Sequence, residues 1–303
     1  MKAKLAVILL CIAALAALPK AAGRHYTYVT AEALLLGLVA VSFNILFGYT
    51  GLLSFGHATF WGTGAYTVAV LMVKFSKPFP LALAASLLTS LAAALAIGYL
   101  SVRHTKIYFA MLTLAFGELF YAVAVKWRFL GGSDGIYGIP KPTGSLISYY
   151  YVVLAGVAAS LAIMWWITQT PLGLTLRAVK DNPMRAEYIG ISVKRARLAS
   201  FVVSGVFAGV AGALYAPLAG AVSPEFFSWT KSAEIVFVTL FGGAVSFIGP
   251  TIGALIYDYM RHLAMGMTEH WMLIVGSLLV ATVLLFPQGV VGAAQAAWRK
   301  VRR

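Results

Sequence analysis

Cysteine is almost absent from this sequence. Cys11 is the only cysteine among 303 residues, so the chain can form no internal disulfide and no cysteine-based metal site. Cys11 lies in the first apolar run, where we expect it to act as a small packing residue.

Charged residues are also scarce, and acids most of all. Nine Asp and Glu stand against 23 Lys and Arg, which gives a net charge of +14. A basic chain can indicate nucleic-acid binding, but here the cations occupy short stretches between apolar runs. Apolar residues make up 61% of the chain and charged residues 11%, against about 45–50% and 25% in soluble domains. This excess favours an integral membrane protein, whose outer surface faces lipid.

The sequence lacks recognisable nucleotide-binding, catalytic and metal-binding motifs. No glycine-rich loop ends in Gly-Lys-Ser/Thr, so the phosphate cradle of an ATPase is absent. We also find no catalytic triad, paired carboxylates or metal-binding cluster in the sequence. The chain is therefore not expected to be an enzyme or to bind a cofactor, and any ATP must be used by another polypeptide.

The apolar runs predict an all-α bundle of about eight to ten transmembrane helices, because a spanning helix needs about 20 mostly apolar residues. The whole chain, 1–303, forms one membrane domain. The run after Lys2 and Lys4 resembles a signal peptide, but so many runs follow that we expect it to remain as a first helix. The eighth and ninth runs are short and could form one re-entrant hairpin. The predicted spans are 5–18, 31–50, 55–74, 79–101, 106–126, 148–168, 198–219, 232–246, 248–264 and 270–287.

Lys and Arg in the short loops predict the orientation. With a cytoplasmic N-terminus, 14 of the 23 cations fall in cytoplasmic segments, including Lys180 and the run Arg299–Arg303, and the nine others include Arg261. Both termini are therefore predicted to be cytoplasmic. An outer loop, 127–147, is rich in glycine and proline and predicts tight turns.

The inner loop, 169–197, is the longest hydrophilic stretch and the most basic. Thr170-Pro171 and Asn182-Pro183 each read as a helix start, and Gly190 suits a left-handed helix end. We therefore predict two short helices here. A short helix with an apolar edge suits docking into a groove on a soluble partner, whereas a basic loop could equally only fix topology or touch anionic lipid.

Several motifs resemble the permeases of bacterial branched-chain amino acid ABC transporters, and their order resembles the M-type subunit. The likeness covers about residues 30–292. It rests on the run Gly48–Ala58, the run Gly131–Ile136, the loop motif Arg177-Ala178 through Asp181-Asn182-Pro183 with Ala186 and Gly190-Ile191, the run Ala208–Leu214, and Phe286-Pro287-Gln288-Gly289.

This resemblance implies an importer in the bacterial inner membrane. The partners would be a second, homologous permease, two cytoplasmic ATP-binding subunits and an external substrate-binding protein. Residues Arg177 to Ile191 would contact the ATPase, with Ala186 and Gly190 in the positions of the short coupling motif. The leading glutamate of the wider motif is not evident, so the resemblance implies no individual salt bridge.

Glycines and buried polar residues mark a possible pathway or packing surface. Gly48, Gly51 and Gly56 could break a helix, and the segment around them weakly resembles Leu240–Ala254. Such paired breaks point to a transport pathway, although chance similarity between apolar runs explains them as well. Asn44 and His57 flank the first break, where a bond to a neighbouring helix is the commoner role; metal binding by His57 is not expected.

Ionisable residues inside spans are few and costly. Glu118 and Asp258 are the candidates for a pathway or a helix contact, while Asp258 and Glu234 could also reach the membrane interface. Branched-chain amino acids are the expected substrates, with urea or short amides as the alternative. A secondary transporter that works alone, or an intramembrane enzyme, would need more intramembrane acids or a catalytic pair.

Overall fold

The computed structural model describes residues 13–19, 23–104, 106–285 and 288–293. Cys11, most of the first predicted span and both charged ends lie outside the described residues. Within the described residues, five helices are long and apolar enough to cross a membrane, and they confirm the predicted all-α bundle. They are α2 (Gly23–Thr50), α4 (Phe79–Ser101), α5 (Lys106–Lys126), α6 (Leu146–Gln169) and α9 (Val193–Ala219).

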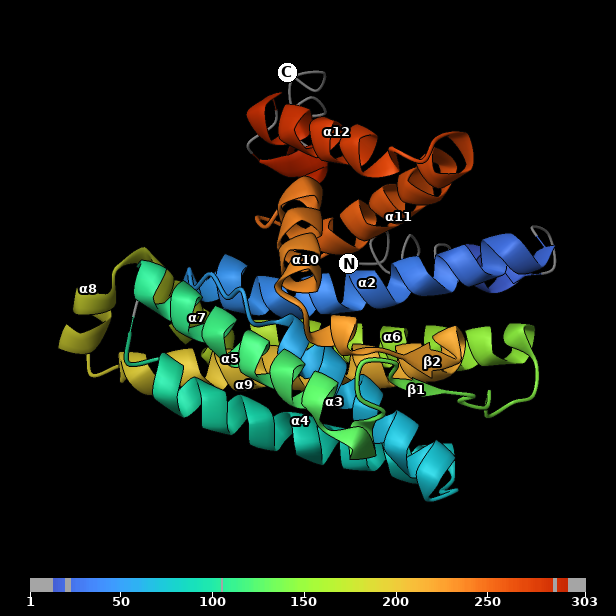
Figure 1. Ribbon diagram of the computed structural model, residues 1–303. Coiled ribbons are helices and arrows are strands. Elements are labelled where there is room, and N and C mark those ends of the chain that lie inside the picture. Colours follow the sequence, from blue (N-terminus) through green and yellow to red (C-terminus); the bar gives the residue numbers. More distant parts are fainter. Residues whose placement is uncertain (1–12, 20–22, 105, 286–287, 294–303) are drawn as a thin grey trace.

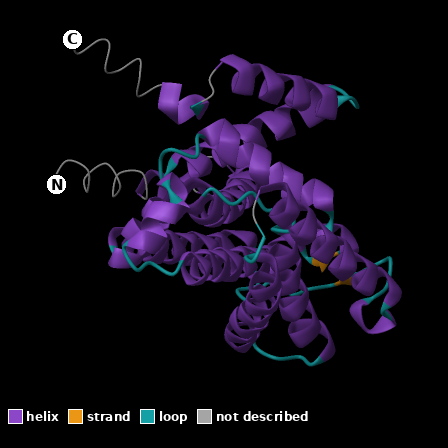
Figure 2. Cartoon of the chain, turned by 90° about the vertical axis from the view of Figure 1, so that its left-hand side faces the viewer, coloured by secondary structure: helices purple, strands orange, loops and turns teal. Residues whose placement is uncertain are grey.

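Shorter elements complete the fold, and Figure 2 shows that the described chain is helical almost throughout. They are α3 (Ala58–Ala69) continued by the π-helical η1 (Val70–Lys74), the 3₁₀ turns η2 (Arg128–Leu130) and η3 (Pro224–Phe227), the strands β1 (Ile136–Tyr137) and β2 (Ala221–Val222), and the helices α7 (Pro171–Asp181), α8 (Pro183–Tyr188), α10 (Trp229–Gly242), α11 (Gly249–Met267) and α12 (Trp271–Leu285).

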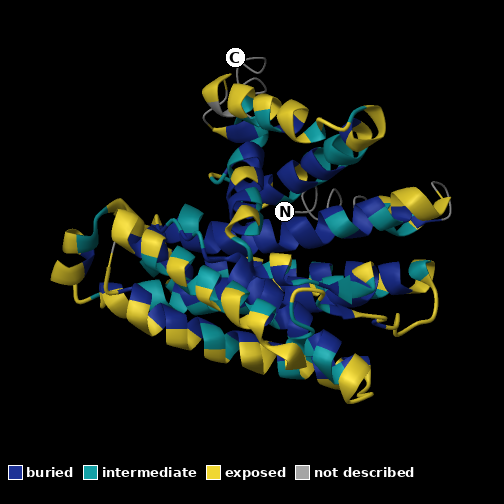
Figure 3. Cartoon of the chain, viewed as in Figure 1, coloured by how far each residue is buried: buried dark blue, intermediate teal, exposed yellow. Residues whose placement is uncertain are grey.

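Helix α2 is the central element of the bundle. In the 18-residue apolar stretch of α2, 94% of the residues are buried, against 28–33% in the corresponding stretches of α4, α5 and α6. It packs against α9, α11, α6 and α10 (Figures 1 and 3). Most exposed side chains of α4 and α5 between the helix ends are apolar, including Leu88, Tyr108 and Met111. These faces are therefore suited to lipid, whereas α2 is enclosed by protein.

Glycines allow α3, α4 and α9 to approach closely. A Cβ added to Gly64 would overlap the carbonyl of Gly209, and one added to Gly212 would overlap the carbonyl of Trp61. The glycine stripe of α9 therefore has the packing role expected of small residues in membrane helices.

Three C-terminal helices stand on one side of α2 (Figure 1). Helix α10 has 14 residues, which at 1.5 Å per residue is about 21 Å long. The hydrocarbon core is roughly 30 Å thick, so α10 alone is too short to cross it. The sequence analysis offered a re-entrant hairpin for the eighth and ninth apolar runs because these runs are short. The length of α10, which corresponds to the eighth run, agrees with that observation.

The predicted outer loop is tied to the end of α9. β1 pairs antiparallel with β2, with Ile136 opposite Val222. Gly131, Gly132 and Gly135 all have positive φ, which confirms the tight turns. In Figure 1 the two strands lie away from α8, which occupies the opposite end of the bundle.

Candidate functional site

The inner loop folds into two capped helices, as the sequence predicts. The Asn182 side chain accepts a 3.0 Å hydrogen bond from the backbone N–H of Arg185 and so caps α8. Gly190 ends it with φ of 86°. Thr170 occupies the N-cap position of α7, but its hydroxyl donates to the Ile167 carbonyl and makes no side-chain cap. Both helices therefore begin where the sequence predicts, although only Asn182, and not Thr170, caps its helix through the side chain.

One face of these helices is buried and the other is free. Ala186 is buried, which fixes α8 to the body of the protein, while Met184, Tyr188 and Ile189 are 65%, 84% and 74% exposed. We call these three side chains the α8 patch. Figure 1 places α8 at the extreme end of the bundle. Apolar side chains displayed on a short, ordered helix suit a protein partner.

Helix α7 is fastened to the end of the central helix. The Lys180 ammonium donates a 2.7 Å hydrogen bond to the carbonyl of Gly48. The Arg177 guanidinium lies over the ring of Tyr49, 5.0 Å from its centre. Both cations lie near the C-terminal end of α2, where the free carbonyls of a helix favour positive charge.

The first glycine-rich break packs tightly at this same end. Asn44 donates to the carbonyl of Ser246 at 3.2 Å. A Cβ on Gly48 would overlap Asn44, and one on Gly56 would overlap the carbonyl of Thr113. Gly51 has φ of 73° and ends α2 in the left-handed region. Gly48 therefore does not break the helix as expected, because α2 continues to Thr50; the break begins at Gly51, and Gly48 and Gly56 are required for close packing.

His57 joins helices in the core. Its Nε2 lies 3.2 Å from the hydroxyls of both Ser42 and Ser204, and its ring packs edge-on against Phe43 and Phe60. The ring is fully buried. Hydroxyl and aromatic neighbours make a packing contact between α2 and α9 and do not form a metal site.

Glu118 is half-buried in α5 and forms no hydrogen bond or ion pair with any residue in the described part of the chain. Gly117 beside it faces Thr59 of α3. The prediction that Glu118 belongs to a pathway or to a helix contact therefore stays a prediction.

Asp258 belongs to a charged cluster that the sequence did not reveal as a unit. The cluster consists of Glu32 of α2, Lys231 and Glu234 of α10, and Asp258, Arg261 and His262 of α11. Arg261 is at its centre, 2.7 Å from Glu32, 3.0 Å from Asp258 and 3.4 Å from Glu234. Lys231 pairs with Glu234 at 2.6 Å, and His262 lies 3.3 Å from Glu32. The cluster therefore joins three helices.

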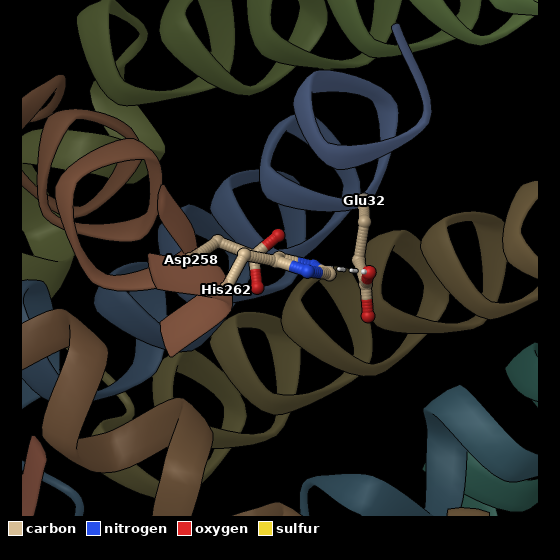
Figure 4. Close-up of side chains that lie close together, drawn as sticks. All are labelled: Glu32, Asp258 and His262. Carbon is tan, nitrogen blue, oxygen red and sulfur yellow. Dashed lines mark hydrogen bonds and ion pairs between the residues drawn. The ribbon is translucent and has the colours of Figure 1, made fainter. Parts of the chain in front are cut away.

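Three members of the cluster have ligand types that could hold a metal ion. Ligand atoms of Glu32, Asp258 and His262 lie within 4.8 Å of one another (Figure 4). However, the Arg261 guanidinium already contacts both carboxylates, and a second cation there would be repelled. The residues fit an ion-pair network better than a metal centre.

Comparison with known proteins decides the family. A model of the family described as branched-chain amino acid transport system / permease component matches residues 26–283. The chain belongs to this permease family. The resemblance recognised in the loop and glycine motifs is thereby confirmed.

Three relatives show how far the likeness extends. The permease is 30% identical over 283 residues to the high-affinity branched-chain amino acid permease protein LivM of Salmonella typhimurium, covering 84% of this chain and 67% of the relative. It is 23% identical to a probable branched-chain amino acid permease protein, LivH, of Methanocaldococcus jannaschii, covering 89% and 91%. A nucleoside permease protein, NupB, of Lactococcus lactis is 39% identical over 34% of this chain and 28% of the relative. No solved structure matches the permease.

Sequence reasoning missed Glu32, Arg261 and Lys180 as members of specific contacts. Arg261 entered only as one of the external cations, and Glu32 lay unremarked within a predicted span. Lys180 and the Gly48 carbonyl are 132 residues apart in the chain, and Glu32 and Arg261 are 229 residues apart. The available signal for Glu32 was its position inside an apolar helix, where an acid needs a partner.

Proposed function

We propose that this permease is the membrane subunit of an ATP-driven importer that moves branched-chain amino acids across the bacterial inner membrane. Its family supports the transport class, and LivM supports the substrate. The α8 patch is the single observation on which the ATP-driven mechanism rests. Its three exposed apolar side chains on a short capped helix provide a binding surface for a separate ATPase.

Two cytoplasmic ATPases would dock on the coupling loops of this chain and of a second, homologous permease. An external binding protein would deliver substrate at the opposite face. Closure of the ATPases would shift the bundle between two states with alternate access. The chain itself holds no ATP and no cofactor in this proposal.

The contacts within the bundle support the proposed sidedness. Segments predicted to be inner contact one another, as Lys180 does with Gly48. Segments predicted to be outer also contact one another, as β1 does with β2. With the cation-rich loop inside, both termini are cytoplasmic.

The ion pairs formed by the intramembrane acids argue against a transporter that works alone. Such a carrier would need free acids for ion coupling, but Glu32, Glu234 and Asp258 are all engaged with Arg261. Glu118 is the remaining candidate.

Reconstitution tests the proposal. The permease would be placed in liposomes with its partner permease, the ATPases and the binding protein, and uptake of labelled leucine would be measured with and without ATP. We expect uptake that requires ATP and the ATPases, and that valine and isoleucine inhibit. Uptake driven by an ion gradient without any ATPase would overturn the transport mechanism, and inhibition by urea, short amides or nucleosides alone would overturn the substrate.

A further inference from the structure

Helix α2 is attached to a different element at each end through a charged side chain. At one end Lys180 of α7 binds the carbonyl of Gly48. At the other end Glu32 binds Arg261 of α11. Glu32 and Gly48 are 16 positions apart, so the two attachments are about 24 Å apart along the helix axis.

No other described element makes this connection. Helix α7 packs extensively against α2, α6, α8 and α9, and α11 packs against α2, α10 and α12. Among the described elements, α2 is therefore the only one that packs extensively on both the coupling helices and the α10–α11 hairpin. It is a continuous helix over Gly23–Thr50 and contains no proline, so it has no break at which motion would be absorbed.

We propose that α2 carries displacement of the coupling helices to the α10–α11 hairpin, with Lys180 and Glu32 as the positioning residues at its two ends. This inference rests on the proposed function, because it needs an ATPase that moves α7 and α8.

The chemistry of the two attachments suits such a role. Each uses a charged group as donor or acceptor, and charge-assisted hydrogen bonds are roughly twice as strong as neutral ones. The Glu32–Arg261 pair is also largely shielded from solvent, with side-chain exposures of 12% and 13%. Midway, α2 is further bound to the hairpin, since Thr239 donates to the carbonyl of Ala40. This neutral bond and the one that Asn44 makes to Ser246 are both 3.2 Å long and weaker, so the Glu32–Arg261 pair is the attachment that passes most of the displacement of α2 to the hairpin.

A competing route runs through α9. This helix follows α8 directly in the chain, and Ser204 binds the carbonyl of Ser42 in α2. If α9 carries the motion, loss of Lys180 leaves the route intact. If α2 carries it, Lys180 and Glu32 act along one path and their effects on transport are not independent.

The test is a double-mutant cycle in the reconstituted complex. Lys180→Met and Glu32→Met remove the charge from each end while keeping a long side chain, and the measured quantity is leucine imported per ATP hydrolysed. We expect each single variant to lower this ratio by roughly two- to thirtyfold. Because the two attachments lie on one path, the loss in the double variant should be clearly smaller than the product of the two single losses.

Three results would overturn the inference. They are an unchanged ratio in either single variant, effects that multiply in the double variant as independent distant sites do, and equal loss in a matched control. That control is Lys194→Met, which removes an exposed lysine from the first turn of α9. Lys180→Arg should keep the ratio, because it restores the donor.

Folding is controlled separately. Glu32→Met leaves Glu234 and Asp258 facing Lys231 and Arg261, so the remaining cluster is balanced in charge. If this variant fails to assemble, Glu32→Gln keeps the shape and one acceptor, and should give an intermediate ratio; a normal ratio in Glu32→Gln would count against the inference. Absence of ATP-dependent uptake in the unmodified complex would instead refute the proposed function itself.

Discussion

Asn44 in α2 donates its side-chain amide to the backbone carbonyl of Ser246, in the turn between α10 and α11, at 3.2 Å. A Cβ on Gly48 would overlap both Asn44 and the carbonyl of Ala244, so this turn lies directly against the last turns of α2. The two glycine-rich segments whose sequences weakly resemble each other therefore meet at one end of the bundle, where the coupling helix α7 is also attached.

Replacing Asn44 with leucine should destabilise this junction. The substitution keeps the approximate shape but leaves the Ser246 carbonyl without its donor, which costs about 1–3 kcal/mol when the group is buried. We expect a lower unfolding temperature of the purified permease in detergent, followed by the fluorescence of its seven tryptophans. Gln169→Leu is the control, because that amide is exposed and binds only its neighbour Thr168. Equal loss of stability in both variants would contradict the role of Asn44.

Local signals in the sequence were sufficient to predict the helices and the coupling loop. Hydropathy located the five long spans, and the Asn182 cap with the left-handed Gly190 located α8. These features depend on neighbours within a few residues, so a single sequence contains them. The spacing of Gly205, Gly209 and Gly212, three and four residues apart, likewise places them on one face of α9.

Contacts between distant segments could not be predicted in the same way. Nothing near Lys180 indicates that its partner is a backbone carbonyl 132 positions earlier. Similarly, Arg261 was counted only among the cations outside the cytoplasmic segments, although it lies at the centre of the charged cluster. The fold brings these groups together, and only the scarcity of acids in the spans hinted that each would need a partner.

Packing of α3 on α9 should fail when Gly64 gains a methyl group. The new Cβ would overlap the backbone carbonyl of Gly209, which cannot rotate away, and overpacking of this kind costs typically 1–3 kcal/mol. Gly64→Ala should therefore lower the unfolding temperature. Gly276→Ala is the matched control, since nothing lies within 4 Å of that position. A Gly64→Ala variant as stable as the control would argue against close packing here.

Bulky residues at the end of α8 should uncouple ATP hydrolysis from transport while membrane insertion stays intact. Gly190 has φ of 86°, which a β-branched side chain adopts only with strain. Gly190→Val should therefore reorient the α8 patch and reduce substrate-stimulated ATP turnover. Gly190→Asn should be tolerated, because asparagine accepts the left-handed region.

Ala186 provides an independent version of this test. It is 2% exposed, so Ala186→Leu should push α8 away from the body of the protein. Normal substrate-stimulated turnover in both Gly190→Val and Ala186→Leu would count against the docking role of the loop.

The α8 patch should supply much of the affinity for the ATPase. A large aromatic side chain at the centre of an interface can contribute 2 kcal/mol or more, which is roughly thirtyfold in affinity. Tyr188→Ala is therefore expected to lose most of the ATPase that co-purifies with the permease. Tyr137→Ala is the control, because Tyr137 is also exposed, at 65%, but lies on β1. Equal retention of the ATPase by both variants would exclude the patch as the binding site.

Sidedness can be tested with single cysteines, because Cys11 is the only native one. On a Cys11→Ser background, Tyr188→Cys should react with a membrane-impermeant maleimide only in inside-out vesicles, and Tyr137→Cys only in right-side-out spheroplasts. Both positions are well exposed, so accessibility depends on the side of the membrane alone. Because Lys180 ties the α8 end of the bundle to Gly48, and Asn44 ties the α10–α11 turn to the same end, one labelled position assigns all three segments. The reverse labelling pattern would place the coupling loop outside the cell, where cytoplasmic ATPases could not bind it.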